Sequence, residues 1–241
     1  MKRKISSILS LMFILVAITA FNANAETEKS ASASVDLMSS YMWRGFELHE
    51  DPAIQPSVGI TYGSFGMNLW SDYNTETKEA TETDLTLNYT FLIDKFSFDA
   101  GYIYFGLENA TDTQEIYLSA AYDMFLSPTL TVYYDFDEGD GTFIEASIGH
   151  NVAVGSDMTL SLGASASYNA DSSYSIGAYN GFHSANVSAA LSIPVNKEIS
   201  ITPMIAYSTG LSSDAKAAIK TLNTDADSDF VYGGVNLALS F

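Results

Sequence analysis

Apolar and polar residues alternate along most of the chain, and the pattern is longest at its C-terminal end, over residues 230–241. One face of this segment carries Val231, Gly233, Val235, Leu237, Leu239 and Phe241. The other face is small or polar after two initial aromatic residues. A period of two indicates a β-strand, and roughly ten residues are what a tilted strand needs to cross a bilayer. The pattern therefore predicts a membrane-spanning strand.

Similar alternating segments recur upstream and predict an all-β protein with twelve antiparallel strands. They cover residues 33–44, 53–62, 65–73, 83–93, 95–105, 114–124, 128–136, 142–154, 158–168, 182–195, 198–208 and 230–241. Strand counts of ten or fourteen are the alternatives, because residues 174–181 can extend a strand or belong to a loop.

The connections between these segments alternate in length. Those after even-numbered strands are tight, such as Gly63-Ser64 and Asn196-Lys197, whereas residues 45–52, 74–82 and 209–229 form long loops after odd-numbered strands. A soluble sandwich has no reason to sort its loops, but an outer-membrane barrel has short turns at one end and long loops at the other. We therefore expect one transmembrane up-and-down β-barrel with both termini on the turn side.

Aromatic residues on the apolar faces fall at two levels. The loop-side level holds Trp43 and six tyrosines, and the turn-side level includes Phe241; the tyrosines are Tyr41, Tyr73, Tyr104, Tyr134, Tyr168 and Tyr207. Amphipathic rings at two levels, with aliphatic residues between them, are typical of the girdles of a membrane barrel. The alternative is the ordinary enrichment of aromatic residues in strands.

The N-terminus has the organisation of an export signal. Lys2-Arg3-Lys4 precedes an apolar run over residues 8–18, and Ala23-Asn24-Ala25 offers a cleavage site. We expect residues 1–25 to be a cleaved signal peptide and residues 26–241 to form the barrel domain. An uncleaved helical anchor is the alternative, but the apolar run is short for one. The chain has no Cys, so no disulfide stabilises it.

The expected barrel is strongly acidic. Three of the ten basic residues lie within residues 1–25, so seven remain against 29 acidic residues, and the net charge is −22. Nucleic acid is excluded as a partner, because binding to phosphate needs a basic surface.

Strand parity places eight carboxylates inside the barrel: Asp36, Asp72, Asp84, Asp99, Glu115, Asp123, Asp135 and Glu145. The expected domain has one Arg, Arg44, and its Lys residues lie in the leader, turns or loops. An unpaired carboxylate buried in an apolar interior costs several kcal/mol or becomes neutral. The sequence therefore predicts a hydrated lumen that prefers cations. The alternative is that loops fold inward and supply Lys.

Residues 39–45, Ser-Ser-Tyr-Met-Trp-Arg-Gly, close the first predicted strand. We expect Tyr41 and Trp43 to face lipid, and Arg44 to line the pore mouth. There Arg44 either sets a constriction or holds the rim by bidentate pairing with a carboxylate.

These residues, with Pro52-Ala-Ile-Gln-Pro56 and Gly66-Met-Asn-Leu-Trp70, resemble the TorF-like family of outer-membrane porins. The resemblance is specific over residues 36–72 and departs from the family pattern at Pro56-Ser57, where paired Gly is favoured. It implies a β-barrel with a pore function and no established catalytic residues.

Two features of the last long loop suggest local structure. Ala215, Ala218, Ile219 and Leu222 have helical spacing, which predicts a short helix over residues 213–223 that covers or enters the pore mouth, or packs on its rim. Asp225-x-Asp227-x-Asp229 imitates the start of a calcium loop, but it lacks the Gly at position six and the Glu at position twelve. We therefore expect no metal site.

The residues available for catalysis are few. Parity places His150 on the lipid face opposite Leu162, which suggests a bulge near Gly149, and it places His183 and Ser184 on opposite faces. The third histidine is His49, and no nucleophile motif or phosphate loop is present. We therefore expect no catalytic residue and no cofactor.

The sequence thus predicts a porin-like channel of the bacterial outer membrane for passive diffusion of small hydrophilic solutes. Lipid is its expected partner, as is the barrel-assembly machinery through the C-terminal strand, whose terminal Phe241 resembles the last residue of outer-membrane barrels. A barrel enzyme and a non-conducting adhesion barrel are the alternatives. The pattern does not distinguish a monomer from a trimer.

Overall fold

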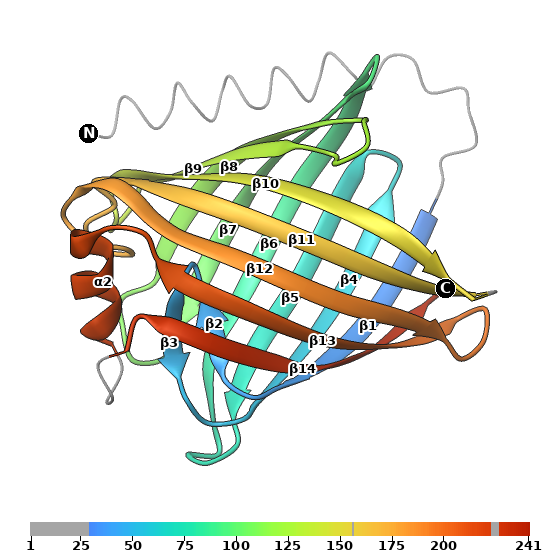
Figure 1. Cartoon of the computed structure of the whole chain (residues 1–241), viewed down its shortest axis with the longest axis horizontal. Helices are drawn as coiled ribbons and strands as arrows, with labels where there is room; N and C mark the ends of the chain where they lie inside the picture. Colours follow the sequence, from blue (N-terminus) through green and yellow to red (C-terminus); the bar gives the residue numbers. More distant parts are fainter. Residues whose placement is uncertain (1–28, 156, 223–226) are drawn as a thin grey trace.

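The computed structural model of the chain describes residues 29–155, 157–222 and 227–241, and these residues form a closed β-barrel (Figure 1). The predicted signal peptide lies outside the described residues, as do Asn223 and Asp225. The strands are β1 (Lys29–Met38), β2 (Tyr41–Trp43), β3 (Phe46–His49), β4 (Ala53–Tyr62), β5 (Phe65–Asn74), β6 (Glu79–Ile93), β7 (Phe96–Leu107), β8 (Thr113–Tyr122), β9 (Thr129–Asp135), β10 (Gly141–Val154), β11 (Met158–Ala170), β12 (Asn180–Pro194), β13 (Ile199–Gly210) and β14 (Asp229–Ser240). The one helix with described bounds is α2 (Ser213–Lys220).

Twelve of these strands close the barrel, in the order β1-β14-β13-β12-β11-β10-β9-β8-β7-β6-β5-β4. The last strand pairs with β13 and with β1, where Leu237 lies opposite Ile201 on one side and Val35 on the other. Every neighbouring pair is antiparallel, and each barrel strand pairs on both sides, so no strand edge is left open to lipid, as a membrane barrel requires. The prediction of a twelve-stranded antiparallel barrel is confirmed.

Most strand boundaries agree with the sequence pattern, but the predicted strand over residues 33–44 is wrong. The barrel strand β1 ends at Met38, and the chain then turns away at Ser39 and Ser40. Residues 41–49 form a separate hairpin, β2–β3, whose turn has positive φ angles of 47° at Arg44 and 88° at Gly45. The alternation continues through the break, so the sequence pattern alone does not mark the end of β1.

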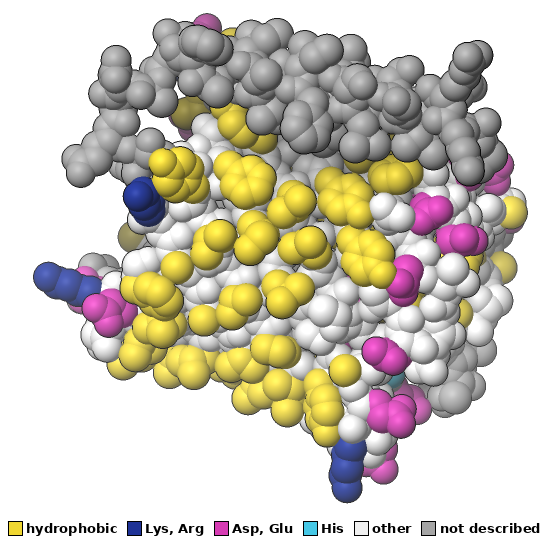
Figure 2. Space-filling model, turned by 180° about the vertical axis from the view of Figure 1, so that it is seen from behind, with side chains coloured by type: hydrophobic (Ala, Val, Ile, Leu, Met, Phe, Trp, Pro, Cys, Tyr) yellow, Lys and Arg dark blue, Asp and Glu magenta, His cyan; other side chains and the backbone are white. Residues whose placement is uncertain are grey.

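The outer surface of the barrel carries a broad apolar band, seen from behind in Figure 2. Large aliphatic side chains lie exposed on it, including Val58, Ile60, Leu118, Val187, Ile205 and Leu237. Exposing so much apolar surface to water is unfavourable, so this band is the surface that faces lipid. Carboxylates gather beyond one edge of the band (Figure 2). Within the described residues, no helix is long and apolar enough to cross a membrane.

Five of the predicted girdle tyrosines lie on the barrel wall near its loop-side end. Tyr134 and Tyr207 have 39% and 41% of their surface exposed, whereas Tyr73, Tyr104 and Tyr168 are partly exposed. The hydroxyls of Tyr104 and Tyr134 donate to Asp112 and Asp140 in the loops, and that of Tyr207 donates to Asp229 at the start of β14. Phe241 is 70% exposed at the other end. Rings beside the apolar band with polar tips toward the loops are the arrangement expected of an interfacial girdle.

Helix α2 lies at the loop-side end of the barrel (Figure 1), where it packs with residues of the β11–β12 loop. The helix is capped by Ser212, whose hydroxyl accepts from the Ala215 amide at 3.1 Å. Its buried Ile219 packs with Phe46 of β3, Phe230 of β14 and Ile176. The predicted helix therefore forms, and it contacts the hairpin at the mouth of the barrel.

Candidate functional site: a constriction in the lumen

The hairpin β2–β3 crosses the interior of the barrel. On one side, the Tyr41 hydroxyl donates to Glu82 Oε2 of β6 at 2.8 Å, and its ring lies 5.5 Å from Trp70 of β5. Two strands further round the wall, Arg44 at the tip reaches Glu115 of β8. The expectation that Tyr41 and Trp43 face lipid is therefore wrong, because the turn at residues 39–40 directs both inward. Tyr41 is only 6% exposed.

Arg44 is held by a carboxylate and by three aromatic rings. Its Nη1 and Nη2 donate to the two oxygens of Glu115 at 2.7 and 2.6 Å, in the bidentate geometry that guanidinium groups favour. The guanidinium carbon lies 4.6, 4.5 and 4.6 Å from the ring centroids of Trp43, Tyr133 and Phe143. Cation–π contacts of this kind strengthen when they are shielded from water. Arg44 thus fixes the hairpin tip inside the barrel.

The tip is also clamped by a β-bulge in β12. The register between β11 and β12 shifts where His183 and Ser184 together lie opposite Ser167, so both side chains are buried. His183 Nε2 donates to the Arg44 carbonyl at 2.7 Å, and a Cβ on Gly45 would come within 2.7 Å of Ser184 Cβ. The expectation that His183 and Ser184 face opposite ways is therefore wrong, because the bulge changes the parity.

The base of the hairpin is fixed at β5. His49 Nε2 lies 2.9 Å from Asp72 Oδ2, and Gln55 donates to Asp72 Oδ1 at 2.9 Å. Burial lowers the pKa of His49, but the hydrogen bond to Asp72, the charge of Asp72 and the contact with Asp51 together outweigh it, so the net shift of the pKa is upward. Burial, with the charge of Glu82, raises the pKa of Tyr41 well above its usual value. At the mouth, burial and Asp214 raise the pKa of Tyr179 to about 12.

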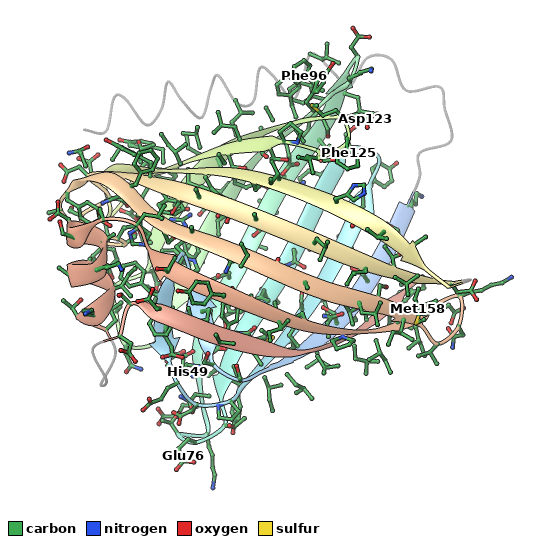
Figure 3. All side chains as sticks on the ribbon, in the orientation of Figure 1. His49, Glu76, Phe96, Asp123, Phe125 and Met158 are labelled. Carbon is green, nitrogen blue, oxygen red and sulfur yellow. The ribbon has the colours of Figure 1, made fainter. Side chains whose placement is uncertain are left out.

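The predicted lumen carboxylates separate into three groups. Asp36, Asp84, Asp99 and Glu145 are inside the barrel and remain partly exposed. Asp72, Glu115 and Asp135 are inside but at most 1% exposed, because the hairpin and the loops cover them. Asp123 was expected in the lumen, but it is exposed in the turn after β8, at the opposite end of the barrel from His49 (Figure 3). Strand β8 ends at Tyr122, one residue before it.

Neutral donors on neighbouring strands hold several of these carboxylates. Asp99 accepts from Asn88, Thr90 and Tyr117 at 2.6–2.7 Å, and Asp36 accepts from Asn236 at 2.9 Å. Neutral hydrogen bonds stabilise a carboxylate without cancelling its charge. The segment that folds into the lumen is the hairpin β2–β3, and its basic side chains are Arg44 and His49. The alternative raised from the sequence was that loops supply Lys.

Glu82 is an inward carboxylate that the sequence prediction missed. It is 5% exposed and lies two residues before Asp84 on the same face of β6, because side chains two apart in a strand point the same way. The predicted strand began at residue 83, so Glu82 was assigned to a loop. The signal available in the sequence was the spacing of Glu82 and Asp84, which places both side chains on the same face if the strand begins before residue 83.

A cavity of about 370 Å³ lies beside the hairpin, within the barrel. Its walls combine five aromatic residues, three charged residues and three others: Trp43, Trp70, Phe105, Tyr133, Phe143, Arg44, Asp84, Glu145, Asn68, Thr86 and Ile103. These residues come from the hairpin and from the wall strands β5, β6, β7, β9 and β10. The cavity is the part of the lumen where charge and aromatic surface meet.

His150 lies on the outside, as its parity predicted, and pairs with Leu162. The predicted bulge near Gly149 is wrong, since the register of β10 with β11 is continuous there. Instead, the turn after β8 folds against His150, whose Nδ1 donates to the Phe125 carbonyl at 3.0 Å. Its ring lies 4.4 Å from that of Phe125, which gives the imidazole a partner beside lipid.

No family model matches the chain, and no curated protein matches its sequence. The resemblance to the TorF-like family therefore stays a prediction. Solved structures do match the fold: the KdgM porin, with a TM-score of 0.55 and 13% identity, covers 88% of this chain and 99% of its own. The NanC porin has a TM-score of 0.54 and 13% identity, with 88% and 98% covered. A further match is KdgM in complex with disordered oligogalacturonate. The chain thus has the barrel fold of small outer-membrane porins.

Proposed function

We propose that this protein is a porin-like channel of the bacterial outer membrane, through which small hydrophilic solutes diffuse passively, with a preference for cations. The observation that carries the proposal is the polar, acidic inner face of a barrel with an apolar outer band. The interior of an eight-stranded barrel is narrow enough for side chains alone to fill it, and twelve strands enclose more space than eight.

The charge of the inner face supports the preference for cations. Asp36, Asp84, Asp99 and Glu145 are partly exposed inside the barrel, whereas Arg44 is paired with Glu115. A narrow passage lined by carboxylates raises the local concentration of cations and lowers that of anions. One structural relative was solved with oligogalacturonate, an acidic saccharide. We infer that the present lumen repels such a polyanion and accepts neutral or cationic solutes.

The hairpin β2–β3 sets the size limit in this proposal. It extends from the β5–β6 wall to the bulge of β12, so a solute passes beside it rather than through an open tube. Small solutes fit the space that remains, and the limit is set by Trp43, Arg44 and the facing wall.

Swelling of liposomes that contain the purified barrel tests this function. We expect swelling in isotonic pentose and hexose solutions, with a rate that falls steeply for disaccharides and larger sugars. Protein-free liposomes and liposomes with the heat-denatured protein serve as controls. A swelling rate equal to these controls with every sugar would contradict a pore and favour a non-conducting barrel.

A further inference from the structure

The carboxyl groups that line the cavity beside the hairpin have no basic partner among the ion pairs of the described residues. Asp84 and Glu145 line it, and its one lining cation, Arg44, is engaged with Glu115. Asp84 Oδ1 is buried and makes no hydrogen bond, although a buried carboxylate oxygen ordinarily has a partner. Glu82 lies on the same face of β6, so it is costly for both carboxyl groups to be ionised at once. A cationic group in the cavity would relieve both costs.

The aromatic walls indicate what kind of cation fits. Trp43 and Trp70 face the cavity with Phe105, Tyr133 and Phe143. The chain already places one organic cation against this surface, since the Arg44 guanidinium stacks on three of the rings. Trp70 contacts Tyr41 but has no cation on its face among the contacts of the described residues. Within those residues, no group of three or more His, Cys, Asp or Glu side chains is arranged to hold a metal ion.

We propose that this cavity is a binding site for small organic cations. An ammonium or guanidinium group contacts Asp84 and Glu145, and the carbon skeleton lies on Trp70. Carboxylates and an aromatic face together favour such a ligand over a hydrated metal ion, which gains little from apolar walls. The site deepens the proposed pore function, because a ligand would reach it through the lumen and would cross the barrel faster than a neutral solute of equal size.

Intrinsic fluorescence reports on this cavity directly, since the two Trp residues of the chain, Trp43 and Trp70, both line it. We would titrate the purified barrel in detergent at low salt with agmatine, which carries an ammonium and a guanidinium group. KCl at matched ionic strength and glucose serve as ligand controls. We expect a saturable change in emission with agmatine alone, and Asp84→Asn or Glu145→Gln to weaken its affinity about tenfold.

Asp123→Asn is the matched control variant, because Asp123 is an exposed carboxylate outside the lumen. It should bind agmatine as the unaltered chain does. An agmatine response that equals the KCl response, or an unchanged affinity in both Asp84→Asn and Glu145→Gln, would overturn the site. Because the titration needs no transport, a saturable response in a barrel that fails to swell liposomes would refute the pore and retain the site.

Discussion

Replacing residues 39–52 with an Asn-Gly turn is expected to raise the single-channel conductance several-fold. The replacement is structurally feasible, because Met38 and Ala53 are paired neighbours of β1 and β4, and Asn-Gly closes a two-residue hairpin. It removes the segment that crosses the lumen from Glu82 to the bulge of β12. The barrel wall keeps all twelve strands, so the cross-section open to ions increases.

The matched control replaces residues 76–78 at the tip of the β5–β6 loop, where Glu76 projects away from the barrel (Figure 3). This change also shortens a polar loop but leaves the lumen as it is, so its conductance should equal that of the unaltered chain. An unchanged conductance after removal of the hairpin would mean that the hairpin does not limit flow. Circular dichroism of each variant establishes that the barrel has folded.

The second large effect concerns the Arg44–Glu115 pair. Arg44→Met leaves Glu115, which is 1% exposed, buried without its cationic partner. Removal of one partner from a buried ion pair is strongly destabilising, and we expect the free energy of unfolding to fall by about 3 kcal/mol. Urea unfolding in lipid vesicles, followed by tryptophan emission, measures this change.

A double-mutant cycle separates the ion pair from simple packing. Arg44→Met combined with Glu115→Met removes both charges, so it should recover most of the lost stability. Arg44→Lys keeps the charge but loses the bidentate geometry, and we expect an intermediate value. If Arg44→Met is as stable as the unaltered chain, or if the double variant is less stable than either single one, the pair does not fix the hairpin.

The barrel strands follow from local physics that the sequence displays. Residues 53–62 alternate, lie between turn residues and match β4 (Ala53–Tyr62). Lipid on one side and a polar lumen on the other impose a period of two, and sorted loop lengths then give the direction of each strand. The partners of the last strand could be predicted because closing the barrel leaves one arrangement.

The site was harder to predict because it depends on departures from that period. The turn at Ser39-Ser40 directs the hairpin into the lumen, so the alternation of Tyr41 and Trp43 no longer distinguishes lipid from lumen. The bulge at His183 adds one residue to β12, which parity cannot detect. Consecutive serines at 39 and 40 and the Arg-Gly pair were the local signals of the turn.

The central claim is that ions cross an acidic lumen narrowed by the hairpin, and the zero-current potential across a planar bilayer tests it most directly. With a tenfold KCl gradient at low salt, we expect discrete channels whose potential has the sign of K⁺ selectivity, and a smaller potential after Asp84→Asn combined with Glu145→Gln. A potential with the sign of Cl⁻ selectivity, or the absence of channels, would contradict the account.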